Sequence, residues 1–115
     1  TGTGRAAGNA LVEHPGVDKI SFTGSTEVGR GIAGKAGERL AHLSLELGGK
    51  NPSIVFPGAV TDELIEGLVL SSRISRQGQS CTAGSRLYLH RDVHDEVLAR
   101  LAERLGSMRV GDPLD

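Results

Sequence analysis

The sequence predicts an α/β fold. Short segments rich in Val, Ile, Leu and Phe alternate along the chain with segments whose apolar residues recur at helical spacing. Gly- and Pro-containing turns separate most of these segments. Alternation of this kind is typical of sheets with at least some parallel strand pairing, because a helix returns the chain between neighbouring strands.

The first half of the chain contains two predicted helices and two predicted strands. Pro15 restricts the residue before it, so the first helix should end at His14. Thr23-Gly24-Ser25 reads as a turn, and Ser25 or Thr26 is a suitable N-cap for the helix that follows. The predicted helices cover residues 4–13 and 26–36, and the predicted strands cover residues 17–22 and 43–47.

The second half repeats the alternation. Apolar residues at helical spacing predict a long helix from residue 60 to 76, and an apolar stripe predicts a second helix from 93 to 105. Gly106 is placed to cap the end of that helix. Residues 53–56 and 86–90 are the two remaining predicted strands.

Composition excludes several classes of protein. The 13 basic and 14 acidic residues are interspersed and give a net charge of -1, which argues against a nucleic-acid partner or a membrane surface. The apolar runs are far shorter than the roughly 20 residues that a membrane span needs. One cysteine and no metal-ligand spacing among the four histidines predict no disulfide and no metal. We therefore expect a cytoplasmic protein.

Cys81 is the only cysteine, and it lies in the polar, glycine-bracketed stretch GQSCTAGSR at residues 78–86. A thiolate is a strong nucleophile, and flanking glycines let a substrate carbonyl approach it closely. Taken alone, a single cysteine is more often a small buried hydrophobe. Both interpretations stay open on this stretch by itself.

Glu46 is a candidate general base. It lies at the end of an apolar strand in LELGGKNP at residues 45–52, and two glycines follow it closely. Partial burial there would make its carboxylate a stronger proton acceptor. The alternative is a glutamate that faces solvent at a strand end, which is the commoner case.

The segment FTGSTEVGR at residues 22–30 has the strand–turn–helix order of a nucleotide phosphate site. A helix N-terminus presents unpaired N–H groups to an anion. Only two glycines, Gly24 and Gly29, match the three-glycine dinucleotide fingerprint, so the motif is weak alone. A turn that needs glycine for steric reasons explains it equally well.

Together and in this order, the three motifs resemble the aldehyde dehydrogenase superfamily, and the likeness runs through essentially the whole chain. Members are several times longer than this sequence. The resemblance implies a partial Rossmann-like cofactor domain at residues 1–47, followed by the start of an α/β catalytic domain at residues 48–115. It also implies NAD or NADP as cofactor, an aldehyde as substrate, and a homo-oligomer in the full-length protein.

The resemblance also implies a role for each candidate residue. Cys81 would attack the aldehyde, and its backbone N–H would form half of the oxyanion hole. Glu46 would activate the water that hydrolyses the thioester. Gly24 and Ser25 would lie against the cofactor pyrophosphate. Val28 and Gly29 would line the adenine side, and Leu47 and Gly48 would lie near the nicotinamide.

Two other functions remain open at this point. The chain could be a non-catalytic remnant or an interaction module, although such a remnant should lose Cys81 or Glu46 early. A cofactor-free thiol hydrolase is less favoured, because no histidine lies near Cys81 in the sequence. Since half of the cofactor site would lie elsewhere, we expect the 115-residue chain alone to be inactive. Its unpaired strand edges should also make it self-associate.

Overall fold

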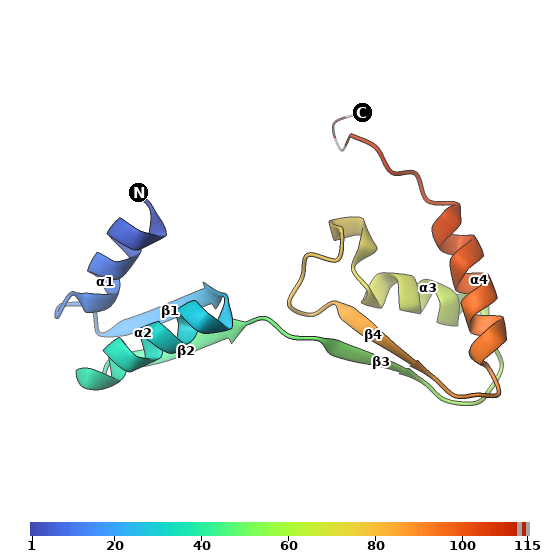
Figure 1. Ribbon diagram of the computed structural model, residues 1–115, viewed down its shortest axis with the longest axis horizontal. Helices are drawn as coiled ribbons and strands as arrows, with labels where there is room; N and C mark the ends of the chain where they lie inside the picture. The colour runs from blue at the N-terminus through green and yellow to red at the C-terminus, as the bar shows by residue number, and fades with distance from the viewer. Residues whose placement is uncertain (113, 115) are drawn as a thin grey trace. The chain divides into compact units, whose positions relative to one another are not determined.

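The computed structural model describes residues 1–112 and residue 114. The chain forms two compact units, Thr1–Gly48 and Gly49–Asp115. Each unit is a two-stranded parallel sheet with helices packed on it (Figure 1). The α/β class and the parallel pairing predicted from the sequence are both confirmed.

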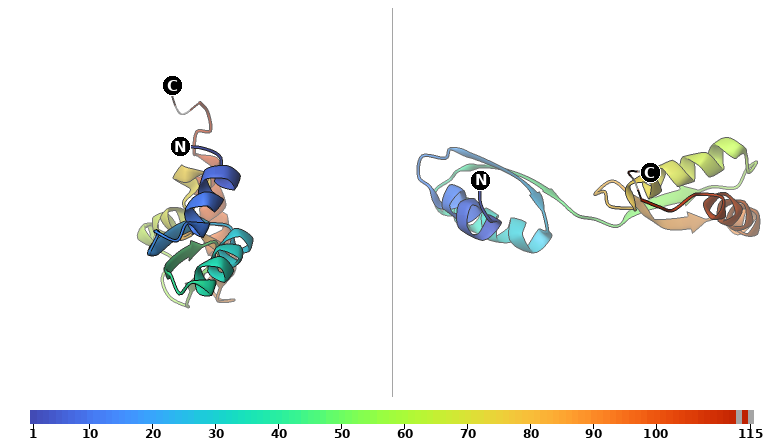
Figure 2. Two further views of the ribbon diagram at one scale, coloured as in Figure 1. Left: turned by 90° about the vertical axis from the view of Figure 1, so that its left-hand side faces the viewer. Right: turned by 90° about the horizontal axis from the view of Figure 1, so that it is seen from above.

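The first unit has a π-helical turn, two helices and two strands. Its buried core is Val12, Ile20 and Ala36, one residue each from the first helix, the first strand and the second helix. Both helices lie on one side of the strand pair when this unit is seen from above (Figure 2, right). The elements are η1 (Gly4–Gly8), α1 (Asn9–Glu13), β1 (Lys19–Gly24), α2 (Thr26–Glu38) and β2 (His42–Leu47).

Strand β1 runs further than the sequence suggested. Thr23 and Gly24, predicted as part of a turn, belong to the strand because the parallel ladder continues through them, opposite Glu46 and Leu47. The turn is therefore confined to Ser25, which is the N-cap of α2 as predicted.

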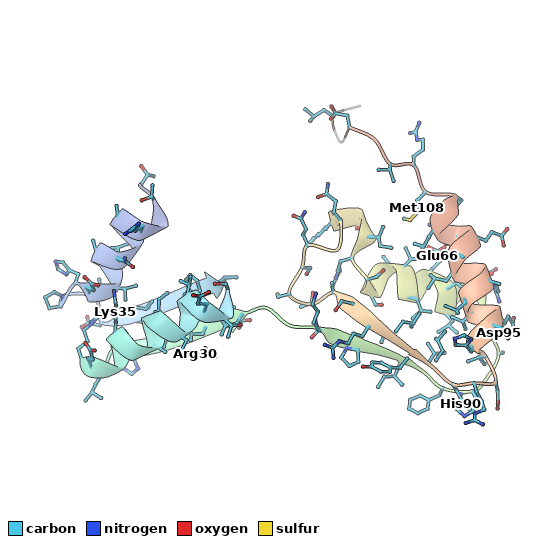
Figure 3. The ribbon with its side chains drawn as sticks, viewed as in Figure 1. Arg30, Lys35, Glu66, His90, Asp95 and Met108 are labelled. Atoms are coloured by element: carbon cyan, nitrogen blue, oxygen red, sulfur yellow. The ribbon has the colours of Figure 1, made fainter. Side chains whose placement is uncertain are left out.

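Hydrogen bonds and an ion pair connect the end of α2 to α1 and to the segment before β1. The guanidinium of Arg39, at the end of α2, donates to the backbone oxygens of Val17 at 2.5 Å and Val12 at 3.1 Å. Lys35, labelled in Figure 3, forms an ion pair with Glu13 at the end of α1. The C-terminal end of α2 therefore contacts both α1 and the segment that leads into β1.

The second unit has two strands, two α-helices and a 3₁₀ turn, and both α-helices pack on the strand pair (Figure 1). Its buried core is Val55, Ile65, Val93 and Val97. The elements are β3 (Asn51–Val55), α3 (Asp62–Ser71), η2 (Ile74–Arg76), β4 (Gly84–Leu89) and α4 (His94–Gly106).

The register of β3 and β4 shifts at the start of the sheet. Asn51 lies opposite Gly84, but Pro52 lies opposite Arg86, so Ser85 is the extra residue of a bulge. Pro52 has no N–H to donate, and bulges are among the few places where a sheet accommodates proline. The irregularity falls directly after the loop that carries Cys81.

The long helix predicted over residues 60–76 is wrong beyond residue 71, because α3 covers Asp62–Ser71 and ends there. The hydroxyls of Ser71 and Ser72 donate to the carbonyls of Leu68 and Val69, which competes with helix propagation. Arg73 then adopts a left-handed φ of 55° and redirects the chain into η2. Periodicity could not reveal this break.

Gly106 was predicted as a cap, but it is the last residue of α4, and Ser107 is the C-cap in a right-handed conformation. Left-handed backbone is therefore not what ends this helix. The hydroxyl of Ser107 instead donates to the carbonyl of Arg104 at 2.8 Å, which satisfies one of the open carbonyls at the helix end.

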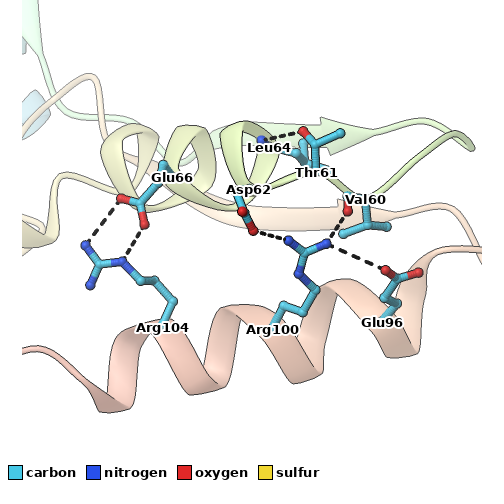
Figure 4. Close-up of polar contacts among 8 residues, drawn as sticks. All are labelled: Val60, Thr61, Asp62, Leu64, Glu66, Glu96, Arg100 and Arg104. Carbon is cyan, nitrogen blue, oxygen red and sulfur yellow. Dashed lines mark hydrogen bonds and ion pairs between the residues drawn. The ribbon is translucent and has the colours of Figure 1, made fainter.

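Helices α3 and α4 are joined by exposed ion pairs (Figure 4). The guanidinium of Arg104 donates hydrogen bonds to both carboxylate oxygens of Glu66, whose side chain points toward α4. The hydrogen bond from Arg104 lowers the pKa of Glu66 below its ordinary value and raises the pKa of Arg104. Arg100 contacts Asp62 and Glu96 and donates to the carbonyl of Val60. These contacts fix the helix pair that covers the sheet.

We expect replacement of Gly84 by alanine to destabilise the second unit. A Cβ at Gly84 would lie 2.3 Å from Ser53 Oγ and 3.1 Å from Ser71 Oγ, two hydroxyls that are hydrogen-bonded to each other at 3.1 Å. Losing that bond and forcing the strands apart should cost about 1–3 kcal/mol. Denaturant unfolding of the two proteins measures the change in the free energy of unfolding.

Gly67→Ala is the matched control. A Cβ at this helical glycine meets no atom within 4 Å, so alanine should raise stability by about 0.5–1 kcal/mol. A Gly84→Ala protein as stable as the native one would contradict the packing described at β4.

Among residues 1–112 and 114, no helix has both the length and the apolar character needed to span a membrane. The same residues contain no group of three or more His, Cys, Asp or Glu side chains arranged to hold a metal ion.

Candidate active site

Cys81 lies in a tight turn immediately before β4. The N–H of Ala83 donates to the carbonyl of Ser80 at 3.1 Å, which makes Cys81 and Thr82 the two central residues of a β-turn. The thiol is free and its residue is exposed. Within the described residues, Cys81 is therefore not a buried hydrophobe.

The orientation of the Cys81 N–H follows from the same turn. This N–H shares a peptide plane with the Ser80 carbonyl, and the two groups of a trans peptide point in opposite directions. Because the Ser80 carbonyl points inward to accept from Ala83 at 3.1 Å, the Cys81 N–H points away from the turn. It therefore takes no part in the hydrogen bond that closes the turn.

The side chain of Asn51, the first residue of β3, is hydrogen-bonded to the turn. Asn51 Nδ2 donates to the carbonyl of Cys81 at 2.6 Å and to the carbonyl of Ala83 at 3.2 Å. The hydroxyls of Ser80 and Thr82 are 3.0 Å apart and hydrogen-bonded on the exposed side. The loop around the thiol is thus fixed by both side-chain and backbone contacts.

No histidine of the second unit lies beside Cys81. His90 follows the end of β4, whereas Cys81 precedes its start, so the six residues of the strand separate them. Six strand residues span roughly 20 Å. His90 and His94 instead contact Asp92 and Asp95. Within this unit, the Cys–His arrangement of a thiol hydrolase is absent from the described residues.

Glu46 is on the exposed face of β2. Leu43, Leu45 and Leu47 alternate with His42, Ser44 and Glu46, and only the leucines are half-buried. The expected partial burial of Glu46 is therefore wrong for the described structure, because strand alternation places it opposite the helix-covered face. Glu46 belongs to the first unit and Cys81 to the second, and each is described within its own unit.

The strand–turn–helix order predicted for residues 22–30 is present: β1 ends at Gly24, and α2 begins at Thr26. Ser25 caps the helix by accepting a hydrogen bond from the N–H of Val28 at 3.3 Å. The N–H of Gly29 makes the first regular helical bond, to the carbonyl of Ser25 at 2.9 Å. The N–H groups of Thr26 and Glu27 precede that bond, so they are left for water or an anion.

Two glycines near this turn leave room for neighbouring side chains. A Cβ at Gly24 would lie 2.4 Å from the Phe22 ring, so glycine lets the ring fold back along β1. This corrects the expectation that Gly24 serves a sharp turn. A Cβ at Gly29 would lie 2.6 Å from Leu47 Cδ2, which brings these two predicted cofactor residues into contact. Gly48 follows Leu47 directly and is exposed.

A hollow of about 580 Å³ lies beside the N-terminal part of α2. Val28 and Leu11, on its walls, are 52% and 63% exposed although both are large and apolar. A concave, largely apolar surface with a few polar groups is the usual form of a small-molecule site. Its lining residues come from η1, α1, β1 and α2, and include Arg5, Asn9, Phe22 and Ile32.

Of these lining residues, only Val28 was a sequence-predicted site residue. Val28 and Ile32 are four residues apart on α2 and therefore share a helix face. That pair was a signal available in the sequence. The contribution of Leu11 and Asn9 was not, because it depends on how η1 and α1 pack beside α2.

Comparison with known proteins gives consistent matches over the chain. A family model described as "Aldehyde dehydrogenase family" matches residues 1–115. The chain is 50% identical over 115 residues to a hydroxyisobutyraldehyde dehydrogenase of Mycolicibacterium austroafricanum, covering 100% of this chain and 23% of that protein.

Solved structures match equally well. PnpE in complex with nicotinamide adenine dinucleotide superposes with a TM-score of 0.92 at 46% identity, over 99% of this chain and 23% of that one. An NADP-dependent enzyme of E. coli superposes with a TM-score of 0.94 at 40% identity, over 100% of this chain and 24% of that one. This chain thus spans about a quarter of the length of the relatives it matches.

Proposed function

This chain belongs to the aldehyde dehydrogenase family, and we propose that it carries the nucleophile, the general base and part of the cofactor site of an aldehyde-oxidising enzyme. The observation that carries the proposal is the exposed Cys81 thiol on a hydrogen-bonded turn, with its own N–H directed outward. A nucleophile and an oxyanion donor on one residue can act on the same carbonyl group.

In the proposed reaction, the Cys81 thiolate bonds to the carbonyl carbon of an aldehyde, and the carbonyl oxygen takes up the negative charge. The Cys81 N–H then stabilises this oxyanion. The nicotinamide cofactor supplies a hydride acceptor, and loss of hydride leaves a thioester on Cys81. The substrate carbon is thereby oxidised by two electrons.

Release of the acid requires a base. We propose that Glu46 takes a proton from water, and that the resulting hydroxide attacks the thioester carbon. The carbon–sulfur bond breaks, the carboxylic acid leaves, and the Cys81 thiolate is regenerated. The exposure of Glu46 within its unit is consistent with this role, because a base for hydrolysis must reach a water molecule.

The first unit has features that fit a dinucleotide. The open N–H groups at the start of α2 suit a pyrophosphate beside Gly24 and Ser25. The hollow lined by Val28 suits a flat apolar ring such as adenine. Gly29, the next residue along α2, packs against Leu47 and would lie at the edge of that site. Leu47 and Gly48 would lie toward the nicotinamide. Relatives include a complex with nicotinamide adenine dinucleotide and an NADP-dependent enzyme, so the proposal is for NAD or NADP.

The whole enzyme would need more than these 115 residues. We propose that residues 1–47 belong to its cofactor domain and residues 48–115 to its catalytic domain, and that the complete protein is a homo-oligomer. The chain alone should then be inactive. Purified 115-residue protein that reduces NAD or NADP with a simple aldehyde would contradict this part of the proposal.

Gly24→Ala tests the cofactor site. In the full-length protein, a methyl group at this position should displace the Phe22 ring, which also lines the hollow. We expect the dissociation constant for the dinucleotide to rise by about tenfold, equivalent to about 1.4 kcal/mol. Fluorescence titration with the reduced cofactor measures it.

The matched control is Gly34→Ala on the same helix, where a Cβ meets no atom within 4 Å. Its affinity should stay within about twofold of the native value, which is below the 1.4 kcal/mol of a tenfold change. Equal affinities for the Gly24→Ala and native proteins would remove the α2 hollow from the proposed cofactor site.

A further inference from the structure

Asn51 makes a double contact that no motif predicted. Its amide nitrogen donates to two backbone oxygens, those of Cys81 and Ala83, at 2.6 and 3.2 Å. A side-chain amide carries two N–H groups on that nitrogen, so both bonds can form together. The opposite orientation would place the amide oxygen against two carbonyl oxygens, so the donor arrangement is the chemically required one.

These bonds fix the peptide planes that the turn itself leaves free. The Ala83-to-Ser80 bond sets the plane between Ser80 and Cys81. By donating to the Cys81 carbonyl, Asn51 sets the peptide plane between Cys81 and Thr82. Its bond to the Ala83 carbonyl sets the plane between Ala83 and Gly84. Cys81 is therefore held on both sides of its Cα atom. The directions of its thiol and of its N–H depend on both constraints.

The backbone of Asn51 is itself well placed for this task. It is the first residue of β3, opposite Gly84, where β4 begins. Pro52 restricts the residue before it to extended conformations, which keeps the Asn51 backbone in the strand. The side chain is half-buried and spans from β3 to the loop. A sheet edge thereby positions a loop that is otherwise exposed.

We propose that Asn51 is a positioning residue for the first chemical step, in that it aligns the Cys81 thiol and N–H toward one carbonyl group. This rests on the proposed role of Cys81 as nucleophile. Small errors in the approach of reacting groups reduce rates strongly, so loss of the Asn51 bonds should slow acylation while cofactor binding persists.

The test uses Asn51→Asp and Asn51→Ala in the full-length protein. Aspartate has nearly the same shape, but it places oxygen atoms against the Cys81 and Ala83 carbonyls; alanine removes the support. Rapid mixing with aldehyde and cofactor gives the rate of the first turnover. For both variants we expect this rate to fall by about 10- to 100-fold. The dissociation constant for the cofactor should stay within about twofold of native, a change far smaller than the tenfold that 1.4 kcal/mol produces.

Ser53→Ala is the structural control. It lies two residues further along β3 and loses a hydrogen bond to Ser71, but it does not contact the Cys81 turn. We expect it to lower the unfolding temperature and to leave the first-turnover rate unchanged. A rate loss equal to that of the Asn51 variants would mean that any weakening of β3 has the same effect, and would overturn the proposal.

The result also separates this inference from the function on which it rests. Native first-turnover rates in both Asn51 variants, together with an inactive Cys81→Ser protein, would overturn the positioning role alone. Turnover by Cys81→Ser would overturn the proposed function itself. Should Asn51→Asp fail to fold, Asn51→Ala gives the same comparison without introducing a charge.

Discussion

Replacement of Cys81 by serine in the full-length protein is expected to abolish aldehyde oxidation, lowering kcat by a factor on the order of 10⁴ or more. A serine hydroxyl is a far weaker nucleophile than a thiolate at neutral pH, and no histidine of the second unit lies beside it to act as a base. The turn should survive, because its hydrogen bonds use the backbone of Cys81 and its neighbours. Steady-state formation of the reduced cofactor measures the loss.

Ser85→Ala is a suitable companion to this variant. Ser85 is the exposed bulge residue at the start of β4, and it has no role in the proposed chemistry. Its kcat should match the native value, and both variants should unfold at the native temperature. A Cys81→Ser protein whose kcat is within tenfold of the native value would exclude a covalent role for the thiol.

Replacement of Glu46 by glutamine should separate the two halves of the reaction. Glutamine cannot take a proton from water, so the thioester should form and then persist. We expect a rapid burst of one reduced cofactor per active site, followed by turnover slower by about 10²- to 10⁴-fold. Rapid mixing resolves the burst, and longer recording gives the steady rate.

Glu38→Gln provides the charge-matched comparison, because Glu38 is an exposed glutamate at the end of α2 with no proposed part in the chemistry. Both its burst and its steady rate should be native. A Glu46→Gln protein that loses the burst as well would place Glu46 in acylation or in folding. Native turnover in that protein would remove it from the reaction.

Much of the fold could be predicted from local sequence. The Ser25 cap, the extent of α2 and the parallel strands all follow from residue type and spacing, which act over a few positions. The predictions were wrong where an element's boundary depends on strand pairing or on side-chain contacts that residue type and spacing do not reveal. Gly24 belongs to β1 because the hydrogen-bonded ladder with β2 continues through it. The absence of a side chain at Gly24 leaves room for the Phe22 ring. Helix α3 ends early because two serine hydroxyls compete for its carbonyls.

Part of the candidate site could also be predicted from local sequence, and part could not. The motifs around Cys81 and Glu46 singled out both residues, and their catalytic roles stay predictions. The exposed position of Glu46 was readable from the strict alternation with Leu45 and Leu47. The support from Asn51 was not, because it joins residues 30 positions apart that only the pairing of β3 with β4 brings together.

The most direct test of the central claim is peptide mass mapping of the full-length Glu46→Gln protein after brief reaction with an aldehyde and oxidised cofactor. The account predicts that the peptide containing Cys81 gains the mass of the acyl group, and only when the cofactor is present. Formation of reduced cofactor with an unmodified Cys81 peptide would show that the aldehyde is oxidised without a bond to this thiol, and would contradict the account.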